Sequence, residues 1–253
     1  MGVEIGLPIL PKAGGELHII LLREWLRDCN ESHSDHGIAS AKDNKLPTRV
    51  LDVGDAESPN QLLLYNTEGK QGKYIALSHR WGEANPLSTM KKNIDAHHNA
   101  INFNDLPKTF QDAVVITRGL NVQFLWIDSL CIIQDDADDW RRESANMEEV
   151  FASAYCTIAA TSAKDSNEGF LNPRPDEQPV RLVDASTGTS FSVYASEVGG
   201  TFNHDVENGV LNKRGWVLQE RALSPRTIHF TTTQTYWECG SVIRCENLIQ
   251  MAK

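Results

Sequence analysis

The chain has 253 residues, of which 40% are hydrophobic and 23% are charged, a balance typical of a globular domain and unlike that of a disordered chain. This length suits one large domain, or a domain with an N-terminal arm. The net charge of −10 argues against nucleic-acid binding, because contact with a phosphate backbone requires clustered Lys and Arg side chains.

The first 45 residues predict a helix followed by a polar linker. Residues 15–29, GELHIILLREWLRDC, have amphipathic helical spacing, and residues 30–45 are rich in Ser, His and Asp. Charges interrupt the apolar run too early for a membrane span, and the first residues lack the positive segment of a secretion signal. We therefore predict a cytoplasmic protein without a membrane span, divided into residues 1–45 and a main domain over residues 46–253.

The five cysteines are an odd number and include no C-x-x-C pair. In a chain expected to stay in the cytoplasm, this pattern predicts reduced and mostly buried thiols rather than a disulfide framework. It also predicts no metal site, because no second pair of ligands has zinc spacing.

The central part of the chain predicts alternating strands and helices. YIALS (74–78), FLWID (124–128) and YCTIAAT (155–161) are short, almost continuous apolar runs, which are typical of parallel strands covered on both faces. Helical spacing lies between them, over residues 106–120 and over residues 135–154. In the second helix the apolar face is predicted to contain Trp140, Ser144, Met147, Phe151 and Ala154.

These elements define the expected fold class, an open and mainly parallel α/β sheet flanked by helices. Residues 47–53 and 60–66 predict two further strands before the first parallel one. Residues 179–195 alternate around a Ser-Thr-Gly turn and predict an inserted β-hairpin. RTIHF (226–230) and QTYWEC (234–239) predict two strands near the C-terminus.

Polar side chains follow the predicted parallel strands, where ligands bind in sheets of this class. Residues 78–82, SHRWG, follow the first strand, and Asp128 ends the second. Gly82 permits a tight turn, and Arg80 has the planar donors that bind a phosphate or carboxylate. Ser78 and Asp128 have a structural alternative, in which they accept hydrogen bonds from loop amides.

A carboxylate on an apolar helix face is the second candidate. In RGWVLQERALSP (214–225), Trp216, Glu220 and Leu223 fall on one face of a helix that Pro225 ends. Such a carboxylate prefers a cationic or hydroxyl-bearing partner. The structural alternative is an ion pair of Glu220 with Arg221 or Arg214, and the spacing alone leaves both open.

Four motifs together resemble the fungal heterokaryon-incompatibility (HET) domain. They are, in chain order, YIALSHRWG (74–82), LWIDSLCIIQDD (125–136), MEEVFASA (147–154) and RGWVLQERALSPR (214–226), within core motifs that run over 74–239. Two positions depart from the usual form: His79, where an aromatic residue is commoner, and Ser129, where alanine is commoner. The resemblance implies a role in non-self recognition with programmed cell death as the output.

The HET domain is in turn distantly similar to TIR domains, and this implies candidate roles for individual residues. In enzymatic TIR domains a glutamate four residues after a tryptophan cleaves NAD at the nicotinamide–ribose bond, which makes Glu220 the candidate catalytic residue and Trp216 its neighbour. Ser78 and Asp128 are then candidates for binding the ribose, and Arg80, with Trp81 and Gly82, for binding the pyrophosphate. NAD is the implied substrate, and no cofactor or metal is implied.

Two other functions stay open at this point. The first is a non-catalytic signalling module that acts through contacts with its own copies or with a partner protein, in which Glu220 is structural. The second is a regulator that binds a nucleotide without turnover. The fold class alone does not decide among the three, because TIR relatives include many assembly modules.

Overall fold

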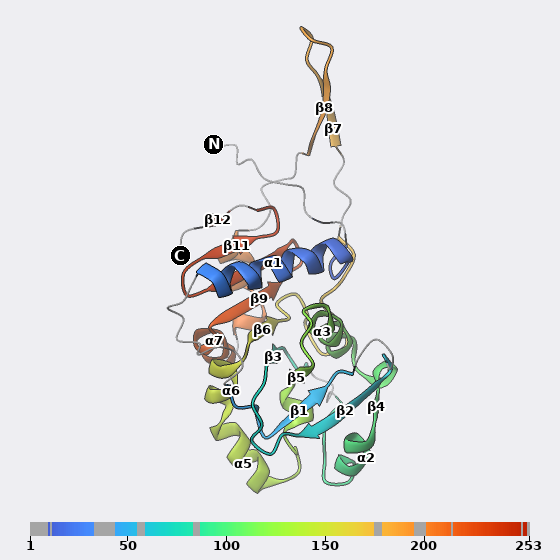
Figure 1. The fold of residues 1–253 in the computed structure, drawn as a ribbon, viewed down its shortest axis with the longest axis vertical. Helices are drawn as coiled ribbons and strands as arrows, with labels where there is room; N and C mark the ends of the chain where they lie inside the picture. Colours follow the sequence, from blue (N-terminus) through green and yellow to red (C-terminus); the bar gives the residue numbers. More distant parts are fainter. Residues whose placement is uncertain are drawn as a thin grey trace.

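The computed structural model describes residues 10, 12–32, 44–54, 59–82, 87–174, 179–194, 201–213, 215–248 and 250–251 (Figure 1). The helices are α1 (Glu16–Ser32), α2 (Ile94–Asn99), α3 (Lys108–Gly119), α4 (Asp128–Cys131), α5 (Ala137–Ala145), α6 (Met147–Ser153) and α7 (Gly215–Leu223), with short helical turns η1 (Phe103–Asp105), η2 (Asn203–Glu207) and η3 (Leu211–Lys213). The strands are β1 (Arg49–Asp52), β2 (Gln61–Asn66), β3 (Tyr74–Ser78), β4 (Ile101–Asn102), β5 (Phe124–Trp126), β6 (Cys156–Ala159), β7 (Pro179–Val183), β8 (Ser190–Tyr194), β9 (Arg226–Phe230), β10 (Thr235–Cys239), β11 (Ile243–Cys245) and β12 (Gln250–Met251).

The main sheet of the described chain is large and mixed. Its strand order is β12-β11-β10-β9-β6-β3-β5-β1-β2-β4. Pairing is parallel only among β9, β6, β3 and β5, and every other neighbouring pair is antiparallel. The prediction of an α/β sheet flanked by helices is confirmed, but the prediction that it is mainly parallel is wrong. Short connections such as residues 231–234 join neighbouring strands only in antiparallel order, whereas a parallel pair needs a crossover.

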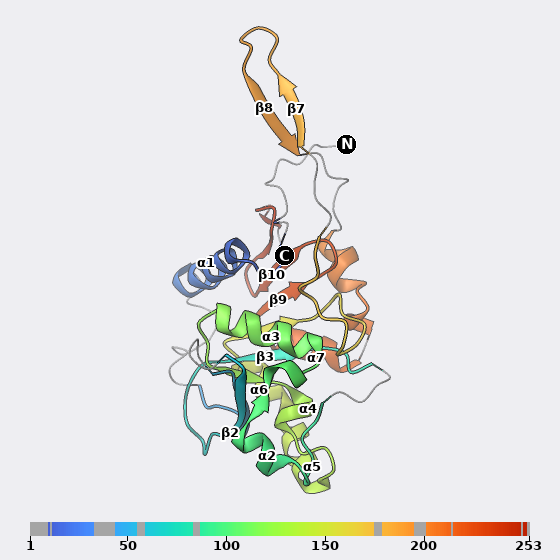
Figure 2. The same cartoon turned by 90° about the vertical axis from the view of Figure 1, so that its right-hand side faces the viewer.

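The four parallel strands are covered on both faces by helices. Ile75 and Leu77 of β3 face the large apolar cluster that includes residues of α1 and α3. Tyr74 and Ala76 face the smaller cluster with α6. Figure 2 shows α1 and α7 on opposite sides of β9 and β10. Since side chains alternate along a strand, Ser78 at the end of β3 faces the side of α6 and α7.

Helix α1 is part of the core of the sheet. Its Leu22, Trp25 and Leu26 are buried in the large cluster, and the Trp25 ring lies 6.5 Å from the Trp237 ring of β10. Burying each of these side chains stabilises the fold by roughly 1.5–3 kcal/mol. The amphipathic pattern of residues 15–29 therefore forms a helix that packs against the sheet.

Residues 135–154 form two helices, and the predicted continuous apolar face is wrong. The break lies at Asn146, and Trp140, placed on that face by its spacing, is 53% exposed. The buried positions of α5 are instead Asp139 and Glu143. Asp136 caps α5 by accepting hydrogen bonds from the backbone amides of Asp138 and Asp139 in the first turn.

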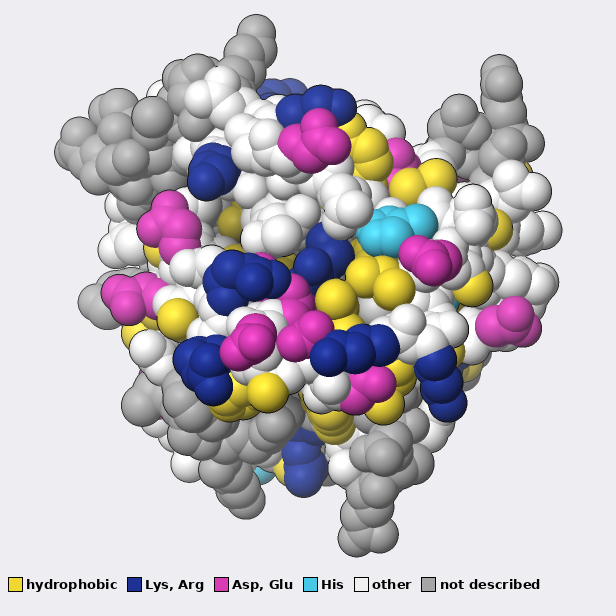
Figure 3. All heavy atoms as spheres, turned by 90° about the horizontal axis from the view of Figure 1, so that it is seen from below, with side chains coloured by type: hydrophobic (Ala, Val, Ile, Leu, Met, Phe, Trp, Pro, Cys, Tyr) yellow, Lys and Arg dark blue, Asp and Glu magenta, His cyan; other side chains and the backbone are white. Residues whose placement is uncertain are grey.

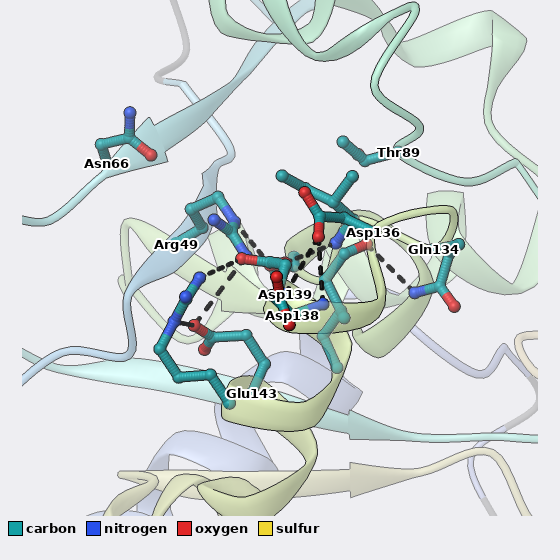
Figure 4. Close-up of polar contacts among 12 residues, drawn as sticks. Arg49, Asn66, Thr89, Gln134, Asp136, Asp138, Asp139 and Glu143 are labelled. Atoms are coloured by element: carbon teal, nitrogen blue, oxygen red, sulfur yellow. Dashed lines mark hydrogen bonds and ion pairs between the residues drawn. The ribbon is translucent and has the colours of Figure 1, made fainter.

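The buried carboxylates of α5 hold it against β1 through Arg49 (Figure 4). The Arg49 Nη2 donates to Asp139 Oδ2 at 2.5 Å and lies 4.0 Å from Glu143 Oε1, and the Arg49 Nε donates to the backbone oxygen of Cys131 at 2.8 Å. Asp139 Oδ2 also accepts from the Ile133 amide at 2.8 Å. A buried charge whose partner is removed is left without water or a counter-charge, so this network makes the position of α5 specific.

The hairpin β7–β8 is separate from the main sheet. It forms a two-stranded antiparallel sheet of its own that projects from the body, as the predicted insertion requires (Figure 1). Val180, Leu182 and Val183 of β7 are 50%, 42% and 61% exposed. An isolated two-stranded hairpin is at best marginally stable in water, so this hairpin gains stability from any surface that covers it.

The face at the opposite end, seen from below, mixes both signs of charge. Figure 3 shows Lys and Arg side chains interspersed with Asp and Glu and with small hydrophobic areas. On α5, an exposed ion pair joins Arg141 to Asp138. In the part of the chain that is described, the apolar stretches of the helices are all too short or too interrupted by charge to cross a membrane.

Adjacent aspartates on α5 provide a matched test of the buried network. We expect Asp139→Ala to lower the free energy of unfolding by about 3–5 kcal/mol, because it leaves Arg49 buried with a weakened counter-charge. Asp138→Ala, in which the lost partner lies on the surface, should cost below about 1 kcal/mol. Urea unfolding of both variants measures the difference; equal losses would contradict a structural role for the buried pair.

The buried His18 of α1 predicts a pH dependence of stability. Burial lowers its pKa from 6.5 to about 4, with Glu246 opposing and Arg174 adding to the shift. In the unfolded chain His18 is protonated below pH 6.5, whereas in the folded chain it is protonated only below about pH 4. The stability contribution is therefore complete above pH 6.5 and is lost as the pH falls toward 4, by about 3 kcal/mol.

We expect His18→Gln to flatten the decline of the unfolding free energy between pH 6.5 and 4. His204→Gln is the control, because the His204 side chain is 82% exposed. Urea unfolding at several pH values measures the slopes. A His18→Gln protein with the wild-type slope would show that other groups cause the decline.

Candidate functional site

A hydrogen bond between Ser78 and Glu220 lies at the end of the central strand β3. The Ser78 Oγ donates to Glu220 Oε2 at 2.5 Å, although the two residues are 142 positions apart in the chain. Ser78 is 3% exposed, and Glu220 is partly exposed. The structure thus brings together two of the predicted site residues, with the carboxylate reaching from a helix toward a strand end.

Contacts at its C-terminal end fix helix α7, which carries Glu220. The Ser224 Oγ lies 2.7 Å from Thr157 Oγ1 of β6 and donates to the backbone oxygen of Glu220 at 2.7 Å. Val217 packs with Ala159 of β6 in a small apolar cluster. Pro225 follows and cannot continue the helix. The helix is therefore held against β6, the parallel neighbour of β3.

Arg221 anchors the other side of α7. Its guanidinium donates to Glu238 of β10 from Nε at 2.7 Å and from Nη2 at 3.0 Å, and its Nη2 lies 3.7 Å from Glu207 Oε1. His229 Nε2 lies 3.0 Å from Glu238 Oε2. Burial raises the pKa of Glu238, but the hydrogen bonds with His229 and Arg221 outweigh it and hold this pKa well below its usual range.

These contacts bear on the ion pair proposed as the alternative for Glu220. Arg221 binds Glu238 of β10 and lies near Glu207 of η2. Arg214 lies outside the described residues, as does the side chain of Trp216, although its backbone is in α7. The predicted contact between Glu220 and an indole therefore stays a prediction.

Asp128 forms a second polar group at the neighbouring strand end. Its Oδ2 accepts from the indole Nε1 of Trp81 at 2.8 Å, and its Oδ1 accepts from the Ser129 amide at 2.7 Å. His79 Nδ1 lies 4.0 Å from the same Oδ1, and the Asp128 side chain is 27% exposed. Asp128 thus satisfies a backbone amide, as the structural alternative expected, and it also joins the SHRWG segment to the end of β5.

His79 is enclosed on the side of α3. It is 4% exposed, and its ring stands edge-on to Phe110 of α3 with 5.1 Å between the centroids. Ser78 and His79 are consecutive, so their side chains leave opposite faces of the chain. Glu220 therefore contacts one side of the segment after β3, at Ser78, and Asp128 lies near the other side, at His79.

The backbone after β3 is held by the loop that follows β6. The Ser166 Oγ lies 3.4 Å from the backbone oxygens of both Arg80 and Trp81. Gly82 has φ +79°, and a Cβ at this position would lie 2.3 Å from the Cβ of Asp165. Arg80 is half-buried. The glycine is therefore required both by its backbone conformation and by close packing.

Other features of the described chain lie away from these residues. A surface hollow of about 790 Å³ is lined by parts of β1, β2 and the end of α3, including Asp52, Arg118 and Gln123, and no predicted site residue lines it. In the described residues, His, Cys, Asp and Glu side chains do not gather in threes as metal ligands.

The sequence reasoning did not single out His229, Glu238, Ser224 or Thr157. The first two lie on one face of the neighbouring strands β9 and β10, where Tyr236 pairs with His229. The alternation within RTIHF and QTYWEC could have indicated this pair. If the two strands are neighbours, His229 and Glu238 lie on the same buried face, where each polar side chain requires a hydrogen-bond partner. Ser224 and Thr157 carry no such signal.

The fold and these contacts define an α/β protein with polar groups gathered at the ends of its parallel strands. A family model described as heterokaryon incompatibility protein (HET) matches residues 74–220, from the first residue of β3 to Glu220. This match covers more than half of the chain, which therefore belongs to the heterokaryon incompatibility (HET) family. No curated protein and no solved structure matches the chain.

The close packing of Gly82 gives a test of this site that does not depend on its function. We expect Gly82→Ala to destabilise the protein by about 2–4 kcal/mol, because a left-handed alanine costs about 1–2 kcal/mol and the clash with Asp165 adds to it. Gly69→Ala is the control, since Gly69 has φ +78° and its nearest neighbour would be Lys45 Cε at 3.7 Å. Both variants carry the cost of the left-handed backbone, and only Gly82→Ala adds the clash, so the difference between their denaturant midpoints measures the clash. A Gly82→Ala protein no less stable than Gly69→Ala would contradict the close contact of Gly82 with Asp165.

Proposed function

We propose that the protein is a cytoplasmic effector of heterokaryon incompatibility that triggers cell death on non-self recognition by hydrolysing NAD to nicotinamide and ADP-ribose. Glu220 is the proposed catalytic residue. The observation that carries the proposal is the hydrogen bond of 2.5 Å by which Ser78 holds the Glu220 carboxylate at the end of β3. A carboxylate fixed there is available to stabilise positive charge in a bound substrate.

The order of the parallel strands supports a TIR-like relationship. Taken in chain order, the four strands are β3, β5, β6 and β9, and their spatial order is second, first, third, fourth. This is the order of the doubly wound sheets in which ligands bind where the winding reverses, here between β3 and β6. Ser78 ends β3, and α7 is held against β6 through Ser224, so Glu220 lies at this position.

The proposed reaction needs few protein groups. The bond between the ribose carbon and the nicotinamide nitrogen breaks, and its electron pair neutralises the pyridinium, so the leaving group needs no acid. Positive charge develops on the ribose, where the Glu220 carboxylate stabilises it. Water then attacks the same carbon and releases a proton. The Ser78 hydroxyl keeps the carboxylate in one orientation and thereby reduces the cost of arranging it in the transition state.

The remaining candidate residues are proposed to bind the rest of NAD. Asp128 would orient ribose hydroxyls, and its bond to Trp81 keeps it in place. Arg80 would bind the pyrophosphate, and Gly82 permits the turn that carries Arg80 and Trp81. Trp216 is proposed as an apolar neighbour of Glu220. Ser78, Asp128 and Arg80 follow parallel strands or belong to one loop, which is consistent with a shared ligand.

The hairpin β7–β8 favours a second candidate function, a non-catalytic module that acts by assembly. Its exposed Val180, Leu182 and Val183 are the kind of surface that a second copy or a partner protein covers. In this case Glu220 serves only to hold α7 against β3. The two functions are also compatible, because assembly is a way to switch on an enzyme.

The Glu220→Gln variant tests the enzymatic proposal. We expect the purified wild-type chain at high concentration to release nicotinamide from NAD, and Glu220→Gln to reduce the rate by a factor of about 100 or more, as the loss of one charge-stabilising group does elsewhere. Gln219→Ala is the control, because Gln219 is exposed on the same helix. Chromatographic detection of nicotinamide is the measurement.

Equal rates for wild type and Glu220→Gln would remove the catalytic role of Glu220. If neither protein releases nicotinamide, but both kill the cells that express them without a fall in cellular NAD, the assembly function is supported instead. In that case substitution of Val180 and Leu182 by serine should abolish killing.

A further inference from the structure

Three side chains gather at the N-terminal ends of the parallel strands, opposite the end that carries Ser78. Lys73 directly precedes β3, Tyr155 precedes β6 and Arg226 begins β9, and β6 is the middle strand of the three. The Lys73 Nζ lies 4.6 Å from the centroid of the Tyr155 ring, and the Arg226 Cζ lies 5.3 Å from it. Two positive charges thus lie over one aromatic ring.

Arg226, the last residue of the fourth motif, is a buried cation without a counter-charge. It is 4% exposed, and among the described residues no carboxylate lies within ion-pair distance of its guanidinium. Its Nη1 donates to the backbone oxygen of Tyr155 at 3.5 Å, and its enclosed Nε has no hydrogen-bond partner. A cation–π contact offsets only part of the cost of burying an ion. Arg49 and Arg174 differ in this respect, because their enclosed guanidinium groups bind carboxylates.

Two further donors at this place have no acceptor in the part of the chain that is described. The Tyr155 hydroxyl accepts from Asn30 Nδ2 of α1 at 3.0 Å, and its own hydrogen is donated to none of the described groups. Lys73 is exposed and forms no ion pair with any of them. Arg226, Tyr155 and Lys73 therefore present three donor groups, two of them charged, that lack an acceptor.

Other lysines add to the positive charge at this end of the sheet. Lys45 and Lys70 are exposed on two segments that meet before β3, where the Leu46 amide donates to the Lys70 oxygen at 2.8 Å. Neither lysine forms an ion pair with a described carboxylate, and the Lys70 Nζ instead bonds to the Tyr65 hydroxyl. Exposed lysines without partners are ordinary on a protein surface, but a buried charge such as Arg226 is not.

A phosphate group is the ligand that these donors fit. A guanidinium presents planar donors that bind phosphate or carboxylate, and a lysine and a tyrosine hydroxyl supply single donors from other elements. Three donor groups suit the several oxygens of a phosphate better than the two oxygens of a carboxylate. Because Arg226 is almost enclosed, only a free or terminal phosphate group can approach it, which excludes the internal phosphates of a nucleic acid.

We propose that Lys73, Tyr155 and Arg226 form a binding site for a phosphate group, either free phosphate or the terminal phosphate of a small molecule. The bound anion supplies the counter-charge that Arg226 lacks, and through the bond of Asn30 to Tyr155 it also secures α1. The proposal is independent of NAD hydrolysis, because this site and the candidate functional site lie at opposite ends of the parallel strands.

Calorimetric titration of the full chain with inorganic phosphate tests the proposal, with chloride at the same ionic strength as the control for screening. We expect one saturable site and a Tm that rises with phosphate concentration. Lys73→Ala should weaken binding about tenfold and Tyr155→Phe, which keeps the ring, severalfold, since each removes a hydrogen bond to a charged group. Lys92→Ala removes an exposed lysine just before α2 and should bind like the wild type. Tighter binding of AMP than of phosphate would identify a terminal phosphate as the ligand, and the reverse would identify the free anion.

Three results would overturn the proposal. The first is the absence of saturable phosphate binding with a Kd below about 10 mM in the wild-type chain. The second is wild-type affinity in both Lys73→Ala and Tyr155→Phe, and the third is loss of phosphate binding in Arg80→Ala, because either places the anion elsewhere. Arg226→Met fills a similar space without the charge, and we expect it to abolish the rise in Tm with phosphate. Lys73→Ala and Tyr155→Phe leave Arg226 in place, so they decide the matter if Arg226→Met does not fold.

Discussion

The burial of the parallel strands on both faces is the constraint on which the other features depend. Strands β3, β6 and β9 are buried along their whole length, so helices must cover both sides of the sheet. The polar side chains of the candidate site lie at the strand ends. Ser78 is the last residue of β3, and α7 brings Glu220 to it. Asp128 follows β5 in the same way.

Buried charges fix the parts that cover this sheet. Arg49 binds Asp139 and holds α5 to β1, and Arg221 binds Glu238 and holds α7 to β10. Breaking one such pair leaves a charge without water or a partner, which is costly. These pairs therefore fix where each helix lies on the sheet, which apolar packing alone does not. Adjacent residues of α7 therefore have separate tasks: Arg221 secures the helix, and Glu220 reaches the strand end.

The two ends of the chain meet in the same core. Trp25 of α1 contacts Trp237, and Arg244 of β11 donates to Asp28 at 2.9 Å. The N-terminal helix and the C-terminal strands therefore share one apolar cluster.

The sequence by itself determined most of the elements and the family. Apolar runs predicted β3, β5 and β6, and the alternation of residues 179–195 predicted β7 and β8, because local spacing records which faces are buried. The motif order predicted a HET protein, which the family match confirms. The sequence also placed Glu220 and Ser78 among the candidates, and left open whether they meet.

Only the tertiary structure decided the pairings between distant positions. Helical spacing put Trp140 on an apolar face, but α5 buries Asp139 and Glu143 instead, because Arg49, some 90 residues earlier, supplies their counter-charge. The antiparallel flanks, the bond of Glu220 to Ser78 and the contact of Trp25 with Trp237 depend likewise on segments far apart in the chain. The spacing of apolar residues along the chain indicates which face of a helix or strand is buried. It does not indicate which distant residue folding brings into contact with that face.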